Sequence, residues 1–296
     1  RTMLGITLPD AGDAAFHAVG RALAGFAGRV DLGLSVPDWL PIRHNRDMRA
    51  GMGYAHALID HAIAAGGRRN GSARTDLLSL LQHASDPESG QRLDPRTLRD
   101  EVAVNLFLGS HQCTLALSWT LHLLASNPDV VGWLEDELTR VLAGRLPTQP
   151  DLPQLVRAAM VIDEALRLYP PFFLIAREAA ADTEIAGYQI PRGRTVALSP
   201  WVTQRDARWF DDPTAFRPAR WTNGAPNGTP RFAYFPFGGG PRVCLALHYA
   251  RVQLIVALAV LVQGCRLRSA PGHTVTPVAR IALSMRAGLH LTVERK

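Results

Sequence analysis

The segment best suited to chemistry in this chain carries a single cysteine. Residues 237–246 read Phe-Gly-Gly-Gly-Pro-Arg-Val-Cys-Leu-Ala, and the apolar run from Leu245 to about Val262 predicts a helix. The N–H groups and the dipole of a helix start favour a thiolate at Cys244. Three glycines let the backbone approach a flat ligand, and Arg242 offers a cation to a ligand carboxylate. A lone cysteine is more often a small buried apolar residue, but the whole pattern favours a ligand-binding thiolate.

Two charged motifs precede this loop. Glu164 and Arg167 lie in a predicted helix, Pro153–Tyr169, where residues at i and i+3 share a face. Arg220 stands between Pro218-Ala219 and Trp221, in a stretch rich in prolines and aromatic residues. Taken singly, each motif is typical of an exposed charge or a surface ion pair.

In this order along the chain, the motifs resemble those of the cytochrome P450 family, the haem-thiolate monooxygenases. The family pattern F-x-x-G-x-R-x-C is present, and alanine stands where the family usually has a second glycine after the cysteine. The resemblance covers essentially the whole chain and most clearly the part from Asp94 onward. The matching residues of the loop are Phe237, Gly240, Arg242, Cys244 and Ala246.

The resemblance implies a cofactor and a role for each motif. Haem b would be bound with Cys244 as the axial ligand of its iron, an arrangement that favours O–O cleavage. Arg242 and Arg177 would each contact a haem propionate. A structural network would join the helix to the proline-rich stretch, through Glu164, Arg167 and Arg220.

A long helix is predicted between Asp94-Pro95 and Asn127-Pro128, because a cap residue followed by proline opens it and no breaker interrupts it. Members of the resembled family usually carry an acid and a threonine there, which deliver protons to bound oxygen. This chain has His111 and Gln112 at those positions. Three interpretations remain open. The two residues relay protons themselves, or ordered water or a substrate hydroxyl does so, or the protein uses peroxide, performs other haem chemistry or is inactive.

The substrate pocket is assigned by the same resemblance. Its segments are mainly apolar and indicate a hydrophobic organic substrate, although apolar residues of this kind are equally typical of a core. The predicted pocket residues are Leu108, Gly109, Phe172, Phe173, Ile175, Ile281, Ala282 and Leu283.

Composition narrows the class of protein. Of 296 residues, 47% are hydrophobic and 20% charged, which is typical of a soluble protein with a sizeable core. The net charge of +6 comes from dispersed arginines without interleaved aromatic residues, so no nucleic-acid partner is predicted. Three cysteines match neither a zinc site nor a disulfide framework and favour a cytoplasmic location. The uncharged stretch Val102–Ala125 contains many polar residues, so no transmembrane span is predicted.

These observations lead to one expected fold and a leading function. We expect a mainly α protein with a small β component, the cytochrome P450 fold, as a single haem domain over residues 1–296. Compared with the family, an N-terminal portion is expected to be missing, and a lost anchor or signal is compatible with that. The expected activity inserts one atom of O2 into a small apolar substrate, with electrons from an external donor (a ferredoxin, a flavodoxin or a reductase).

Two alternatives accompany this hypothesis. The first is a peroxide-driven or catalytically degenerate haem protein of the same fold, suggested by His111 and Gln112. The second treats the glycines 238–240 as an anion-binding nest of a nucleotide-binding protein, which the absence of an accompanying lysine-bearing strand–loop–helix unit disfavours.

Overall fold

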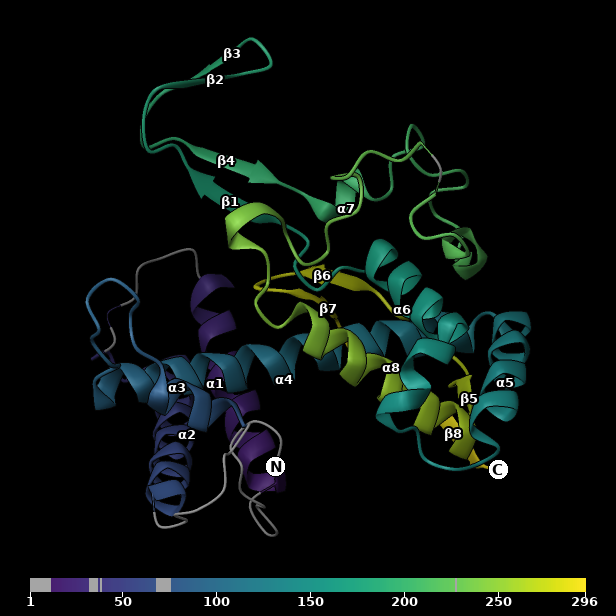
Figure 1. Ribbon diagram of the computed structural model, residues 1–296, viewed down its shortest axis with the longest axis horizontal. Coiled ribbons are helices and arrows are strands. Elements are labelled where there is room, and N and C mark those ends of the chain that lie inside the picture. Colours follow the sequence, from purple (N-terminus) through teal and green to yellow (C-terminus); the bar gives the residue numbers. More distant parts are fainter. Residues whose placement is uncertain (1–11, 32–36, 38, 68–75, 227) are drawn as a thin grey trace. The chain divides into compact units, whose positions relative to one another are not determined.

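The computed structural model describes residues 12–31, 37, 39–67, 76–226 and 228–296 (Figure 1). Helices predominate and the described strands form two-stranded sheets, so the predicted mainly α fold with a small β component is confirmed. The chain divides into two compact units, Arg1–His111 and Gln112–Lys296. The organisation as a single domain stays a prediction. The described helices are α1 (Gly12–Asp31), α2 (Arg43–Gly67), α3 (Leu77–His83), α4 (Pro95–Ala125), α5 (Pro128–Leu142), α6 (Val156–Leu168), α7 (Pro200–Thr203) and α8 (Leu247–Gly264).

In the first unit, α1 and α2 pack closely against each other. Gly25 makes this possible, because a Cβ added there would lie 2.5 Å from the backbone oxygen of His44. A small apolar core joins these helices to α3 and the start of α4, through Ala22, Ala55, Ile59, Ala62, Leu78, Leu98, Val102, Ala103 and Phe107.

The predicted long helix is confirmed as α4, which begins in the first unit and ends in the second. The Asp94 carboxylate caps it, accepting the N–H groups of Arg96 at 2.9 Å and Thr97 at 3.1 Å. Since Pro95 lacks an N–H and stands at the first helical position, the cap loses no hydrogen bond there.

The main core of the second unit lies between α5, α6, α8 and the last part of α4. Its fully buried side chains include Leu134 and Leu138 of α5, Val161 of α6, and Leu258 and Ala259 of α8. Because α6 is buried along nearly its whole length, it is the element around which the rest of the unit is organised.

The start of α6 differs from the sequence prediction. Instead of a helix from Pro153, the chain forms a 3-10 turn, η1 (Gln149–Gln154), and the α-helix begins at Val156. The physical reason is a cap from another element: the buried Glu137 carboxylate of α5 accepts the N–H groups of Arg157 at 2.8 Å and Ala158 at 3.0 Å.

The small sheets follow α6. The pair β2 (Thr183–Ile185) and β3 (Tyr188–Ile190) forms a hairpin, and β1 (Ile175–Glu178) pairs antiparallel with β4 (Thr195–Leu198). The stretch from Thr183 to Leu198 therefore contributes strands to two separate ladders. Figure 1 shows the β2–β3 hairpin continuing outward from the β1–β4 pair. The later pairs join β5 (Cys265–Ser269) to β8 (Leu291–Arg295), and β6 (Pro277–Ala279) to β7 (Leu283–Met285).

Among the described residues, α8 is the one helix whose length and hydropathy match those of a membrane span. One third of it is buried in the protein, and it contributes Leu254, Ile255, Leu258, Ala259 and Val262 to the main core. The core helix of a globular domain has the same character.

Candidate functional site

The loop that carries Cys244 has a defined backbone. Gly238 and Gly240 have positive φ angles of 75° and 67°, which residues other than glycine rarely adopt. The N–H of Cys244 donates to the backbone oxygen of Phe237 at 2.9 Å, and that of Gly238 to Phe235 at 2.9 Å. These hydrogen bonds close the loop, and the short 3-10 turn η3 (Gly240–Arg242) lies inside it.

Cys244 is exposed and its thiol is free. The next helix, α8, begins at Leu247, with Ala246 as its N-cap residue and no side-chain cap. Apolar side chains beside the cysteine are also exposed: Leu245 has 93% of its surface accessible and Val243 46%. Burying such side chains stabilises a complex by roughly 25 cal/mol per Å², so this surface suits a flat apolar ligand.

Two arginines predicted to hold carboxylates remain available for such contacts. Arg242 is exposed, and its side chain makes no hydrogen bond or ion pair to the residues that the structure describes. Arg177, on β1, is also exposed, and among the described residues its side chain donates only from Nη1 to the oxygen of its neighbour Ala176 at 2.8 Å. Each guanidinium therefore keeps donors for a ligand carboxylate.

The structure brings Glu164, Arg167 and Arg220 together. Two hydrogen bonds of 2.9 Å join the buried Glu164 carboxylate to Nε and Nη2 of Arg167, and Nε of Arg220 donates to it at 3.0 Å. The indole of Trp221 donates at 2.8 Å and the N–H of Arg217 at 2.9 Å. A buried carboxylate is tolerated when it is paired and hydrogen-bonded in this way.

From this network, Gln204 extends the connections toward the cysteine loop. Arg167 donates to the backbone oxygen of Gln204 at 2.8 Å. The fully buried amide of Gln204 donates to the oxygens of Leu166 and Arg167 at 3.1 Å and accepts the N–H of Phe235 at 2.8 Å. The sequence did not single out Gln204, because an isolated glutamine gives no recognisable pattern.

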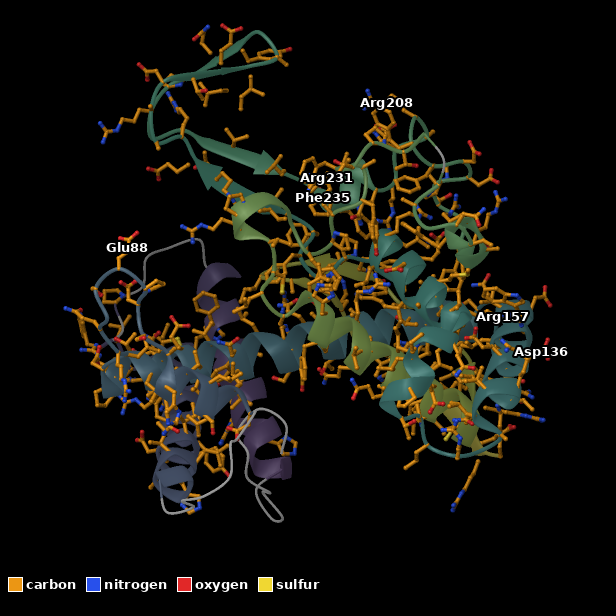
Figure 2. The ribbon with its side chains drawn as sticks, in the orientation of Figure 1. Glu88, Asp136, Arg157, Arg208, Arg231 and Phe235 are labelled. Atoms are coloured by element: carbon orange, nitrogen blue, oxygen red, sulfur yellow. The ribbon has the colours of Figure 1, made fainter. Side chains whose placement is uncertain are left out.

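A pocket of about 360 Å³ adjoins the loop, and the sequence analysis did not identify it. Gly239 and Val243 line it together with Arg231, Phe232 and Phe235; Figure 2 labels Arg231 and Phe235. The Arg231 guanidinium lies 5.3 Å from the centre of the Phe232 ring. In the sequence, the aromatic residues just before the glycines are the feature that could have indicated this pocket.

The residues at the proton-delivery positions have contrasting surroundings. Burial lowers the pKa of His111, which favours a neutral imidazole. Both polar amide atoms of Gln112 are buried and have no hydrogen-bond partner among the described residues. The next residue, Cys113, has its pKa raised by burial and then by Cys244, so this part of α4 lies near the cysteine loop.

Two of the predicted pocket segments meet. The N–H of Leu283 donates to the backbone oxygen of Pro171 at 2.8 Å, and the indole of Trp119 donates to the oxygen of Leu283 at 2.9 Å. Exposure varies among the predicted pocket residues: Ala282 and Leu283 are buried, Gly109, Phe173, Ile175 and Ile281 are half-buried, and Leu108 and Phe172 are exposed.

Comparison with known proteins gives the family. The sequence profile of the family "Cytochrome P450" matches residues 12–288. This chain belongs to the cytochrome P450 family. It is 34% identical over 245 residues to cyclooctatin synthase of Streptomyces melanosporofaciens, covering 83% of this chain and 53% of that protein. It is 35% identical over 240 residues to pentalenene oxygenase of Streptomyces avermitilis, covering 81% and 53%. The chain thus spans about half the length of these curated relatives.

A solved structure agrees with the predicted fold. The structure titled "Retinoic acid bound cyanobacterial CYP120A1" superposes with a TM-score of 0.85 at 25% sequence identity, covering 99% of this chain and 65% of that one. The cytochrome P450 fold is therefore confirmed, and family membership implies a haem iron cofactor.

The residues of the cysteine loop fit a haem. An exposed, free thiol offers the iron a ligand, and the exposed side chains of Val243 and Leu245 offer the porphyrin an apolar surface. Arg242 and Arg177 keep donors for the two propionates. Gly240 carries no side chain, and no atom lies within 4 Å of the place where its Cβ would be, so its backbone is open to a flat ring.

Proposed function

We propose that this chain is the haem-binding part of a monooxygenase that inserts one atom of O2 into a small apolar substrate. The observation that carries the proposal is an exposed, free Cys244 at the tip of a glycine loop in a member of the cytochrome P450 family. A thiolate-ligated haem supplies the oxygen chemistry when it is bound, because the thiolate favours O–O cleavage.

The residues of the chain have separate tasks in this proposal. Cys244 binds the iron, Arg242 and Arg177 hold the propionates, and Phe237, Gly240 and Ala246 shape the loop around the ring. The Glu164 network fixes the segment that leads to the loop, through Arg167 and Arg220.

An apolar substrate agrees with the names of relatives. Pentalenene oxygenase and cyclooctat-9-en-7-ol 5-monooxygenase are named for an unsaturated hydrocarbon and an unsaturated alcohol. The segments proposed to contact the substrate are Leu108 and Gly109, Phe172, Phe173 and Ile175, and Ile281, Ala282 and Leu283. Phe172 and Leu108 have exposed apolar side chains, which supports this assignment.

Electrons are proposed to come from an external donor, a ferredoxin, a flavodoxin or a reductase. Arg231 is exposed beside the cysteine loop and favours an acidic partner, because opposite charges speed the encounter. A cytoplasmic location fits the three free cysteines of the chain.

A second candidate, peroxide-driven or lost activity, is favoured by the amide of Gln112. Its buried polar atoms have no described partner, and an amide has no hydroxyl proton to deliver. In the leading proposal, the neutral imidazole of His111 moves the proton, or the Gln112 amide holds the water that does so.

Carbon monoxide spectroscopy tests the haem-thiolate assignment. The reduced, haem-loaded protein should show the red-shifted Soret band of thiolate ligation, and Cys244→Ser should abolish this band while Cys265→Ser keeps it. A wild-type protein that binds haem without this band contradicts the assignment. Comparing product formation with an electron donor and with peroxide then separates the two candidates, since only the leading one requires the donor.

A further inference from the structure

The residue before Glu164 holds a second buried network, which we call the Asp163 network (Asp163, Tyr234 and Arg251). The Asp163 carboxylate accepts both terminal N–H groups of the Arg251 guanidinium, that of Nη2 at 2.9 Å. It also accepts the Tyr234 hydroxyl at 3.0 Å. The side chain of Asp163 is 13% exposed and that of Arg251 is 32% exposed, so the carboxylate is largely removed from water and the guanidinium is half-buried.

The chemistry of each member favours this pairing. Burial raises the pKa of Asp163, while Arg251 acts against that shift and favours the carboxylate. Burial also raises the pKa of Tyr234 well above its usual range, so the hydroxyl stays protonated and donates. In the apolar helix that follows the loop, Arg251 is the one charged residue. A partly buried charge in an apolar helix is stabilised by a counter-charge, and Asp163 supplies it.

The two partners of Asp163 lie on opposite sides of the cysteine in sequence. Tyr234 precedes Phe237, whose backbone oxygen accepts the N–H of Cys244, and Arg251 lies in α8 after the loop. Asp163 therefore attaches both ends of the segment 234–251 to one point on α6. Through the pair with Arg251, the start of α8 is joined to α6 shortly after the cysteine.

Its neighbour Glu164 faces a different segment. Successive residues of an α-helix point about 100° apart, so Glu164 holds Arg220 and Trp221 while Asp163 holds the loop segment. The two adjacent carboxylates therefore hold two different segments of the polypeptide near Cys244.

We propose that Asp163 is a positioning residue for the Cys244 thiolate, acting by holding both ends of the loop segment. This inference rests on the proposed function, in which Cys244 binds the haem iron. Asp163 itself touches neither the iron nor the substrate. Without the Asp163 charge, Arg251 is left as a half-buried cation with no counter-charge, and the loop segment opens locally before the domain unfolds.

The test compares Asp163→Asn with wild type by two readouts. In the haem-loaded protein, rising urea should convert the thiolate-type carbon monoxide band to that of haem without thiolate, while helical circular dichroism persists. At a urea concentration below the unfolding midpoint, the fraction converted should be about tenfold that of wild type. In the haem-free protein, hydrogen exchange of the Cys244 N–H, bonded to Phe237, should be about tenfold faster.

Asp151→Asn is the matched control. Asp151 is another buried carboxylate paired with an arginine, Arg145, but its partners lie away from the cysteine segment. Asp151→Asn should lower the free energy of unfolding. In this variant the thiolate band and the helical circular dichroism should be lost together, at the same urea concentration. The proposal is overturned if Asp163→Asn behaves like this control by both readouts.

Two arrangements keep the test informative. If Asp163→Asn does not fold, Tyr234→Phe removes one hydroxyl from the same network and should shift both readouts in the same direction by less; no shift overturns the proposal. If the wild-type protein lacks the thiolate band, the proposed function fails, and hydrogen exchange at Cys244 in the haem-free protein still decides whether Asp163 holds the loop.

Discussion

At the scale of single residues, the cysteine loop depends on backbone conformations that only glycine adopts easily. Gly240 has a φ of 67°, and a Cβ added there would meet no atom within 4 Å. The requirement for glycine at this position is therefore conformational and does not come from crowding. The cysteine loop could be predicted from the sequence because the property that each residue supplies is fixed by its type: a thiol at Cys244, a guanidinium at Arg242 and a permissive backbone at Gly240.

Gly240→Ala should destabilise the protein by about 1–2 kcal/mol, because an L-residue pays that much in the left-handed region. The matched control is Gly132→Ala in α5, where an added Cβ also has open space but the backbone is helical. This substitution should stabilise by about 0.5–1 kcal/mol. Urea unfolding of both variants measures the two effects, and equal signs would contradict the conformational argument.

At the scale of elements, α6 connects the segments around the site. Glu164 holds the segment containing Arg220 and Trp221, and Asp163 holds the segment containing Tyr234 and Arg251. Since all these partners are distant in sequence, α6 stabilises contacts that no local preference provides.

Glu164→Gln should lower the free energy of unfolding by about 3–5 kcal/mol, because it leaves Arg167 buried without its counter-charge. The control substitution is Glu135→Gln, which breaks the partly exposed pair with Lys296. Exposed pairs contribute about 0–1 kcal/mol. Urea titration followed by circular dichroism gives both values. Comparable losses in the two variants would show that the Glu164 network is not a buried ion-pair network in solution.

Elements with local start and stop signals were predictable. Both bounds of α4 and the start of α5 follow from Asp94-Pro95 and from Asn127-Pro128, where the Asp94 cap and the two prolines act within a few residues. The start of α6 was not predictable, because its cap comes from Glu137 on another helix. Likewise, the pairing of β1 with β4 depends on where the chain returns after the β2–β3 hairpin.

The candidate site shows the same division. Cys244, Arg242 and the Glu164 motif were found from their residue types and order. Asp163, Gln204 and the pocket beside Phe232 were not found, since their partners come together only in the fold. One signal was available: Arg251 is a single charge inside an apolar helix, and such a charge indicates a buried partner.

At the scale of the whole molecule, stability should depend on pH through Asp151. Its carboxylate accepts hydrogen bonds of 2.6 Å from both terminal nitrogens of Arg145, and Thr148 donates from its backbone and hydroxyl. These contacts, that with Arg145 first, hold the pKa of Asp151 far below its usual range. As the pH falls, the Asp151 carboxylate is therefore protonated in the unfolded chain before it is protonated in the folded protein.

The stabilisation from Asp151 should be fully present above about pH 4, near the pKa of an unfolded aspartate, and should be lost progressively below it. The difference in unfolding free energy between wild type and Asp151→Asn should accordingly be constant from about pH 7 to about pH 5 and shrink below about pH 4. Urea titrations across this range measure the difference. A difference that stays constant through the acid range would exclude a lowered pKa at Asp151.

Gln204 restricts how the sequence of this fold can diverge. Its buried amide serves as donor and acceptor at once, linking the end of α6 to Phe235. Glutamate would turn an oxygen toward two carbonyl oxygens, and leucine would leave the Phe235 N–H without its acceptor. Many residue types are tolerated at a surface position, but few can replace Gln204. A redesigned sequence for this fold should therefore keep glutamine at this position.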